Sequence, residues 1–166
     1  MTANQPAFQD QIPENYCWGC GPLNPHGLHI KSRWSASGDE AICVWHPGQW
    51  HMAGPQHILN GGIIATIIDC HCICTAIADA YRREERSLSS APLIWYVTGG
   101  LDVSYLRPSP IDRPVELRAR LDEIKGKKTV VSCSLQSDGE ECATARLVAI
   151  RVPPEWRERH GAPAAH

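Results

Sequence analysis

The chain has 166 residues, with 16 Lys and Arg against 18 Asp and Glu, and 43% of its residues are hydrophobic. This length and composition favour one globular domain and exclude a mainly disordered chain. The balanced charge leaves no excess of basic side chains to neutralise phosphates, which argues against a nucleic-acid-binding protein. The polar first residues, interrupted by Pro6 and Pro13, lack the pattern of a secretory signal, so we expect a cytoplasmic protein.

Residues 1–28 are rich in turn-forming residues and show neither a helical nor a strand period, which predicts an N-terminal arm. Two short β-prone runs, His29–Trp34 and Glu40–His46, flank a turn rich in Ser, Gly and Asp and predict two antiparallel strands. Residues Trp50–Asn60 have no period and are expected to form a loop.

An apolar run begins at Gly61 and continues to Tyr81, where charged residues follow. Its length alone would allow it to cross a membrane, but it contains Asp69, His71 and Asp79, and ionisable groups are costly in hydrocarbon. An apolar segment longer than any ordinary strand is typical of a helix at the centre of a globular core. We therefore predict one long buried helix and no membrane association.

The second half of the chain predicts four strands and completes an α+β fold. The second of these runs alternates regularly, with Val115 and Leu117 facing one way and Glu116 the other. The order of elements predicts an antiparallel sheet of about six strands wrapped around one long central helix, spanning residues 29–153 and followed by a tail at 154–166. The four runs are Trp95–Arg107, Pro114–Ile124, Thr129–Gln136 and Cys142–Val152.

The chain contains eight cysteines, and three of them alternate at Cys70, Cys72 and Cys74 within the apolar run. This pattern is typical of small reduced core residues rather than of a disulfide framework. Cys17 and Cys20 have the spacing of a zinc or redox pair, and with His26 and His29 they would allow a Cys2His2 site. No second Cys-x-x-Cys is present, and a thioredoxin-like role lacks its βαβ context.

Three segments carry motifs: CWGCGPLNPHGL at residues 17–28, NGGIIATIID at 60–69, and VTGGLDVSYLRP at 97–108. Together they resemble the hot-dog-fold acyl-CoA thioesterases, in particular the phenylacetyl-CoA-type (PaaI) branch. The resemblance implies a hot-dog fold, hydrolysis of an acyl-CoA to a free acid and CoA, and no obligatory metal or cofactor. Two departures are Asn60, where the family usually has His, and Gln56-His57 in the approach loop.

The resemblance implies catalytic roles for three residues. Asp69 matches the acid that acts as general base on water or as nucleophile toward the thioester carbonyl. Gly61 matches the oxyanion-hole glycine, whose N–H at the helix start polarises the carbonyl oxygen. Thr98 matches the Ser/Thr that orients the water. The structural alternatives are a buried acid satisfied by nearby donors, a glycine that only turns the chain, and an ordinary strand threonine.

The sequence around Thr98 does not alternate simply, so the face of the strand on which Thr98 lies depends on whether the strand is interrupted. Thr98 shares the face of Asp102, while Leu101 lies on the other face, if the strand alternates without interruption. Gly99-Gly100 is a candidate β-bulge that would reset this alternation.

The spacing of Gly61 and Asp69 bears on assembly. Eight residues of helix span roughly 12 Å, so one thioester cannot touch both residues of a single chain. If both roles hold, Asp69 meets Gly61 of another subunit. We therefore expect a two-fold homodimer and leave open a dimer of dimers.

Further candidates would bind substrate. Gly62, His57 and Asn60 lie at the entry to the helix, where they could contact the acyl or pantetheine part. Lys127 and Lys128 in a charged turn, and Arg107 after a strand, could meet the phosphates of coenzyme A. The alternative is that these charges are only solvated.

His71 is expected to be a core or interface histidine, because two helical residues separate it from Asp69 by roughly 200°. A different class of function also stays open: a non-catalytic hot-dog dimer that binds an acyl-CoA or a small aromatic ligand, which Asn60 motivates. A hydratase on the same fold is disfavoured because no Asp/His pair can be placed. The acyl preference cannot be read from the sequence.

Overall fold

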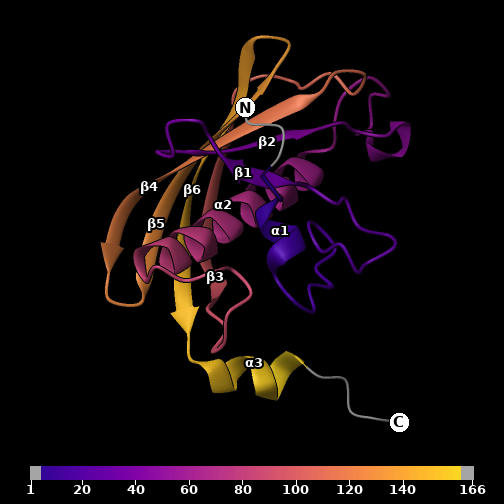
Figure 1. Cartoon of the computed structure of the whole chain (residues 1–166). Coiled ribbons are helices and arrows are strands. Elements are labelled where there is room, and N and C mark those ends of the chain that lie inside the picture. The colour runs from indigo at the N-terminus through magenta and orange to yellow at the C-terminus, as the bar shows by residue number, and fades with distance from the viewer. Residues whose placement is uncertain (1–4, 162–166) are drawn as a thin grey trace.

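The computed structural model describes residues 5–161, in which six strands form one antiparallel sheet of order β1-β2-β4-β5-β6-β3. Figure 1 shows the sheet curling around one long helix, α2, which confirms the predicted fold class. The strands are β1 (Ser32–Trp34), β2 (Ala41–Trp45), β3 (Trp95–Tyr105), β4 (Val115–Lys125), β5 (Lys128–Ser137) and β6 (Glu140–Val152). The helices are α1 (Phe8–Gln11), the 3-10 turn η1 (Gln49–His51), α2 (Gly61–Arg83) and α3 (Pro154–Gly161).

Helix α2 begins directly after Asn60, whose side-chain oxygen accepts hydrogen bonds from the N–H groups of Gly62 and Ile63. Asn is favoured at this position because it satisfies donors that have no partner inside the helix. The helix ends at Arg83, two residues beyond the predicted end at Tyr81. The loop before it and the helix therefore meet at a defined cap.

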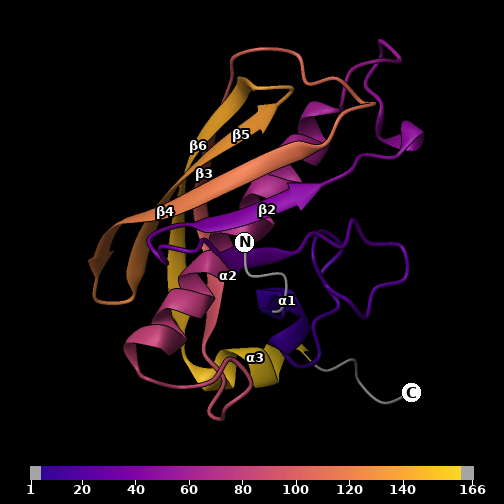
Figure 2. The ribbon, with the colours of Figure 1, turned by 45° about the horizontal axis from the view of Figure 1, so that its top comes forward.

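The middle of α2 fills the core. Ile67, Ile68, Cys72 and Ala76 have no exposed surface, and the arm with α1 lies beside the helix in both views (Figure 1; Figure 2). The helix is long and apolar enough to cross a membrane, but most of its apolar stretch is buried inside the fold. Such burial is what a central helix of a globular domain shows.

Strand β4 shows the predicted alternation of burial. Val115 and Leu117 are fully buried against α2, whereas Glu116 is partly exposed. The pattern holds only in the first half of the strand, because its second half runs into the exposed β4–β5 hairpin.

Strand β3 contains the β-bulge that the two glycines predicted. The register with β6 shifts between Thr98 and Gly100. A Cβ on Gly99 would lie 2.7 Å from Ile150 Cγ1, so only glycine fits there without displacement. Beyond the bulge, Leu101 packs against the core, which means that the strand has changed phase.

Both ends of the described chain differ from the expected arm and tail. Phe8 in α1 is buried, and its ring lies 5.2 Å from that of Trp34. Residues Pro154–Gly161 form α3, although the sequence analysis gave 154–166 no regular structure. Proline suits a first helical turn, and the Glu and Arg residues that follow favour helix. Residues 162–166 of the expected tail lie outside the described residues.

Candidate active site

The carboxylate of Asp69 meets the hydroxyl of Thr98. Thr98 Oγ1 on β3 donates a hydrogen bond to Asp69 Oδ1 on α2, with a distance of 2.6 Å between the oxygens. The contact exists because the Gly99 bulge lets Thr98 face the helix together with the residues beyond it. The structure therefore brings together two of the three residues to which the resemblance assigns catalytic roles.

Partial burial affects the titration of Asp69. Burial raises the pKa of Asp69, and the hydrogen bond from Thr98 opposes this rise without cancelling it. Thr98 is exposed, so solvent or a ligand can reach the pair in a single chain. The pair offers a carboxylate with raised proton affinity next to a hydroxyl that fixes its orientation.

Gly61 presents a backbone donor at the start of α2. Within residues 5–161, no side chain or backbone oxygen accepts a hydrogen bond from the Gly61 N–H, whereas those of Gly62 and Ile63 are taken by Asn60. An unpaired N–H at a helix start, favoured further by the helix dipole, suits an oxygen that develops negative charge.

Tyr105 holds the Gly61 carbonyl, in the peptide unit next to the one that carries the Gly61 N–H, and was not identified from the sequence. Its hydroxyl donates a hydrogen bond to the Gly61 carbonyl oxygen at 2.7 Å. A Cβ on Gly61 would lie 3.5 Å from the Tyr105 ring, so the ring covers the glycine at ordinary contact distance. The change of phase at the Gly99 bulge, which turns Tyr105 toward α2, was the available signal.

The residues proposed to contact substrate at the start of α2 differ in whether their polar groups are already bonded within the chain. Asn60 is the N-cap of α2, so its side-chain oxygen is occupied within the chain. The Gly62 N–H is bonded to this oxygen and is therefore not a free donor. His57 is exposed on the preceding loop, and its carbonyl oxygen accepts from the N–H of Ile111.

The candidate phosphate-binding cations lie at opposite ends of the sheet. Arg107 follows β3 and pairs with Glu140 at 3.2 Å. Tyr105 is in register with Ala143 of β6, while Lys128 is in register with Ile150. Seven residues of β6 separate these positions, a distance of roughly 23 Å. Arg107 and the Lys127-Lys128 pair therefore form no common patch within one chain.

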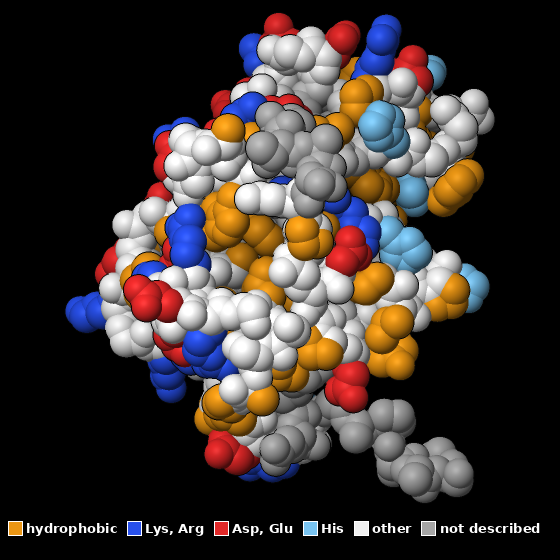
Figure 3. All heavy atoms as spheres, in the orientation of Figure 1, with side chains coloured by type: hydrophobic (Ala, Val, Ile, Leu, Met, Phe, Trp, Pro, Cys, Tyr) orange, Lys and Arg blue, Asp and Glu red, His pale blue; other side chains and the backbone are white. Residues whose placement is uncertain are grey.

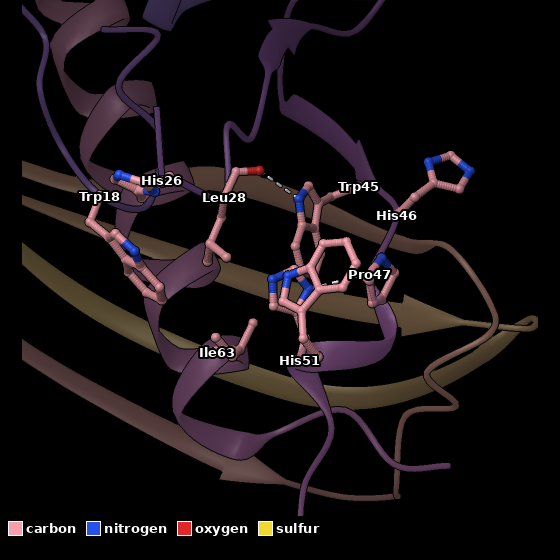
Figure 4. A pocket seen from close by; sticks show the side chains of 11 residues that line it. Trp18, His26, Leu28, Trp45, His46, Pro47, His51 and Ile63 are labelled. Carbon is pink, nitrogen blue, oxygen red and sulfur yellow. Dashed lines mark hydrogen bonds between the residues drawn. The ribbon is translucent and has the colours of Figure 1, made fainter. Parts of the chain in front are cut away.

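A pocket of about 580 Å³ opens beside the first turn of α2. Figure 4 shows Leu28, Ile63, Trp45 and His51 around it, while His46 points away. The histidines of this face gather over the loop before α2 and the arm (Figure 3). The pocket is lined by Trp18, His26, Gly27, Leu28, Trp45, His46, Pro47, Gly48, Trp50, His51 and Ile63.

The aromatic wall of this pocket is fixed by hydrogen bonds. Trp45 Nε1 donates to the Leu28 carbonyl at 2.8 Å, and the Gly48 N–H donates to His51 Nδ1 at 2.9 Å. The Trp45 and His51 rings lie 5.1 Å apart. Burial lowers the pKa of His51, which favours a neutral ring. The pocket therefore has an ordered aromatic wall that a flat or apolar group could contact.

His71 is a core histidine, as predicted. It is fully buried, with Nδ1 at 2.8 Å from Ser32 Oγ and Nε2 at 3.2 Å from the Ala41 carbonyl oxygen. Gln9 Nε2 in turn donates to Ser32 Oγ. Burial lowers the pKa of His71 to about 4, which favours the neutral ring. Its two nitrogens contact Ser32 and Ala41 rather than Asp69.

The family model described as the thioesterase superfamily matches residues 56–144, which include α2 and the Asp69–Thr98 pair. The chain belongs to the thioesterase superfamily. A crystal structure of a thioesterase superfamily protein from Shewanella loihica is 30% identical, with a TM-score of 0.60 over 78% of this chain and 96% of that chain.

Curated relatives in the superfamily include acyl-coenzyme A thioesterase THEM4 from Mus musculus, 30% identical over 110 residues, which are 65% of this chain and 42% of the mouse protein. The chain thus spans less than half the length of these curated relatives. The PaaI protein of E. coli is 12% identical, with a TM-score of 0.60 over 76% of this chain and 81% of that chain, a similarity of fold.

Proposed function

We propose that this chain is an acyl-CoA thioesterase that hydrolyses an acyl-CoA to the free acid and CoA. The observation that carries the proposal is the 2.6 Å hydrogen bond from Thr98 to Asp69, on a largely apolar helix. The names of the THEM4 relatives support the substrate class. A Streptococcus mutans protein of the same fold, 14% identical and with a TM-score of 0.59, is described as bound to acetyl CoA.

Asp69 acts in this proposal as the general base. The Thr98 hydrogen bond occupies Oδ1 and leaves Oδ2 free to take a proton from water, while the Thr98 oxygen can accept the other water hydrogen. The water oxygen forms a bond to the thioester carbon, and the C–S bond then breaks. The proton held by Asp69 passes to the departing CoA thiolate.

The Gly61 N–H of the partner subunit supplies the oxyanion donor. Within one chain it lies roughly 12 Å along α2 from Asp69, too far to serve the same thioester. The peptide unit that carries this N–H is fixed by the Asn60 carbonyl oxygen, which accepts from the Ile64 N–H at 3.1 Å, and Tyr105 fixes the next unit through the Gly61 carbonyl oxygen. The donor therefore lies in an ordered first turn when the thioester oxygen becomes negative.

The edge position of β3 supports a homodimer. This strand is eleven residues long and ends the sheet, which leaves one side of its backbone available for pairing with a second copy. Thr98 with Asp69 lies toward one end of β3, and Tyr105 with Gly61 lies at the other. Antiparallel pairing of two β3 strands about their middle reverses these ends. It therefore brings the Asp69 of each subunit toward the Gly61 of its partner.

The same pairing favours Arg107 over Lys127 and Lys128 as the contact to CoA phosphates. Arg107 follows Tyr105, so in the proposed dimer it lies at the end of β3 where substrate enters the partner's Asp69 site. Lys127 and Lys128 lie two strands away in the sheet order. We infer that Arg107 supplies the charge that holds the nucleotide end.

The test is release of free thiol from a panel of acyl-CoAs by wild type, Asp69→Asn and Asp112→Asn. Asp112 is an exposed carboxylate outside the site, so its variant controls for a simple loss of charge. The proposal expects turnover by wild type and Asp112→Asn, and loss of turnover in a folded Asp69→Asn variant. Wild-type turnover by Asp69→Asn would reject the mechanism. Saturable acyl-CoA binding by wild type without thiol release would support the binding-only alternative instead.

A further inference from the structure

Four cysteine side chains meet where the N-terminal arm lies against α2. Cys17 and Cys20 come from the arm, and Cys70 and Cys74 lie about one turn apart on the helix. The Sγ atoms of Cys17, Cys20 and Cys70 all lie within 4.8 Å of one another. Cys17 Sγ is 3.6 Å from Cys70 Sγ, and Cys20 Sγ is 3.9 Å from Cys74 Sγ. Two distant segments therefore bring three thiols into one group, and Cys74 lies beside it in contact with Cys20.

We propose that this cluster is a structural zinc site, with Cys17, Cys20, Cys70 and Cys74 as its four ligands. A tetrahedral ion with Zn–S bonds of 2.3 Å holds its sulfur atoms about 3.8 Å apart. The distances of 3.6 Å from Cys17 to Cys70 and 3.9 Å from Cys20 to Cys74 lie on either side of this value. Cys74 Sγ is outside the group whose members all lie within 4.8 Å of one another, so its side chain would have to turn toward the ion to complete the site. Cys-x-x-Cys is a common spacing for one half of such a site, and Cys-x-x-x-Cys on a helix places two more ligands on one face.

The arm is shaped to bring its sulfurs to the helix. A Cβ on Gly19, between the two arm cysteines, would lie 2.4 Å from Cys70 Sγ, so glycine leaves the space that this sulfur occupies. A Cβ on Gly21 would lie 2.4 Å from the backbone nitrogen of Cys17, in a turn where the Gly21 N–H donates to the Cys17 carbonyl at 2.7 Å. Both glycines are therefore required by close approach rather than by loop flexibility.

A buried amide supports one of the sulfurs. Asn15 is 3% exposed, and its Nδ2 lies 3.8 Å from Cys20 Sγ. Its Oδ1 accepts from the N–H of Cys17 at 3.2 Å, which ties the same side chain to both arm cysteines. Donors of this kind around a metal site orient the ligands and offset the negative charge of thiolates.

The sequence offered His26 and His29 as partners of the two arm cysteines. In the structure, cysteines of α2 take that place instead. His29 Nε2 is engaged with the Asn24 carbonyl oxygen at 2.5 Å, and His26 lines the aromatic pocket. All eight cysteines are free thiols, and the distances within the cluster far exceed the roughly 2.05 Å of a disulfide. Cys17 is exposed while the other three are buried, which gives an ion one route of entry.

Four protein ligands complete the coordination of zinc, so the ion would hold structure and leave no position for substrate. It would join the arm to the turn of α2 that carries Asp69. Trp18, between Cys17 and Cys20, lines the pocket next to Ile63, so the ion would also hold one wall of that pocket in place.

The experiment measures zinc in the full chain purified under reducing conditions, together with Co²⁺ binding to protein stripped by a chelator. We expect one zinc per chain, and a thiolate-to-cobalt charge-transfer band and strong visible absorption on addition of Co²⁺. Cys70→Ala is expected to lose both signals. Cys72→Ala is the matched control, because Cys72 is fully buried on the same helix and is not a proposed ligand; it is expected to keep both.

The Co²⁺ titration of wild type keeps the proposal testable if Cys70→Ala fails to fold. Stripped wild type that retains its circular dichroism spectrum and takes up no Co²⁺ would overturn the proposal. So would equal zinc content in folded Cys70→Ala and in Cys72→Ala, or isolation of a Cys17–Cys70 disulfide from the reduced preparation. None of these readouts depends on hydrolysis of acyl-CoA.

Discussion

The hydroxyl of Tyr105, the last residue of β3, donates a hydrogen bond to the carbonyl oxygen of Gly61, the first residue of α2. This contact links the strand proposed as the dimer edge to the backbone proposed as the oxyanion donor. The other end of the same strand makes the Thr98–Asp69 contact. One strand therefore positions both parts of the candidate site.

Removing the Tyr105 hydroxyl is expected to reduce catalysis with little effect on substrate affinity. In Tyr105→Phe the ring still covers Gly61, but the Gly61 carbonyl loses a hydrogen bond worth about 1 kcal/mol. Because this loosens the first turn of α2 next to the proposed donor, kcat should fall by up to about fivefold while KM stays close to wild type. Steady-state kinetics with the best acyl-CoA measure this split. Tyr16→Phe, a change at an exposed tyrosine, serves as the control. An unchanged kcat in Tyr105→Phe would show that the first turn of α2 needs no anchor from Tyr105.

The hydroxyl of Thr98 is expected to contribute more to catalysis than the volume of its side chain does. Thr98→Ser keeps the donor to Asp69 and should retain most of the activity, whereas Thr98→Val keeps the shape and should lower kcat about tenfold or more. Single-turnover rates separate this effect from product release. Equal rates for the two variants would contradict a role for the hydroxyl in positioning water.

The bulge can be tested at two adjacent glycines. Gly99→Ala places a methyl group 2.7 Å from Ile150 Cγ1 and should lower the free energy of unfolding by about 1–3 kcal/mol, with a loss of activity as Thr98 shifts. Gly100→Ala meets no atom within 4 Å and should leave activity close to wild type. Thermal unfolding and kinetics of the pair measure the difference. Similar behaviour of the two variants would contradict the assignment of the bulge to Gly99.

Asn60 is expected to act on stability through the helix cap. Asn60→Ala should lower the free energy of unfolding by about 1 kcal/mol, while Asn60→Ser should restore most of it, because serine also accepts hydrogen bonds from the first turn. Denaturant unfolding measures both variants. If the two variants are equally stable but share a large increase in KM, the side chain binds substrate and its capping role is minor.

His71 is expected to make the fold sensitive to acid. Its pKa is lowered from 6.5 to about 4 by burial, so the unfolded chain takes up a proton at a higher pH than the folded protein does. The resulting stabilisation is complete above pH 6.5 and is lost as the pH falls toward 4, by about 3 kcal/mol in total. The free energy of unfolding should change less with pH in His71→Gln than in wild type. In His57→Gln, a change at an exposed site, it should change as in wild type. Parallel curves for His71→Gln and wild type would show that the acid sensitivity does not come from His71.

Local patterns predicted the elements of this fold well. The length of the apolar run from Gly61 favoured a long helix, and the alternation in Val115–Ile124 specified a strand with one buried face. The pair Gly99-Gly100 indicated a bulge because glycine weakens a regular strand. Such signals depend on neighbours in the sequence, which is why they could be read without the structure.

Contacts between distant segments were harder to predict. The bond from Tyr105 to Gly61 follows from the phase of β3 after the bulge, and the separation of Arg107 from Lys128 follows from the register of β3, β5 and β6. The approach of Cys70 to Cys17 depends on where the arm lies, and the arm has almost no regular structure from which to predict its course. Asn60 stands where the resembling family usually has histidine, but its position before an apolar helix is also a common helix start signal, and the structure shows it as the cap.

The central claim is that Asp69 of one subunit works with Gly61 of the other, and a mixture of two inactive variants tests it most directly. Asp69→Asn removes the base. Gly61→Pro removes the N–H donor at a first helical position that tolerates proline, after an Asn60 that is already extended. Each variant alone should lack activity while keeping its fold by circular dichroism.

When the two variants are unfolded together in equal amounts and refolded, half of the dimers should be mixed, and each mixed dimer should contain one intact site. The account predicts recovery of about a quarter of the wild-type acyl-CoA hydrolysis per chain. No recovery in a mixture shown by mass spectrometry to contain mixed dimers would contradict a site shared between subunits.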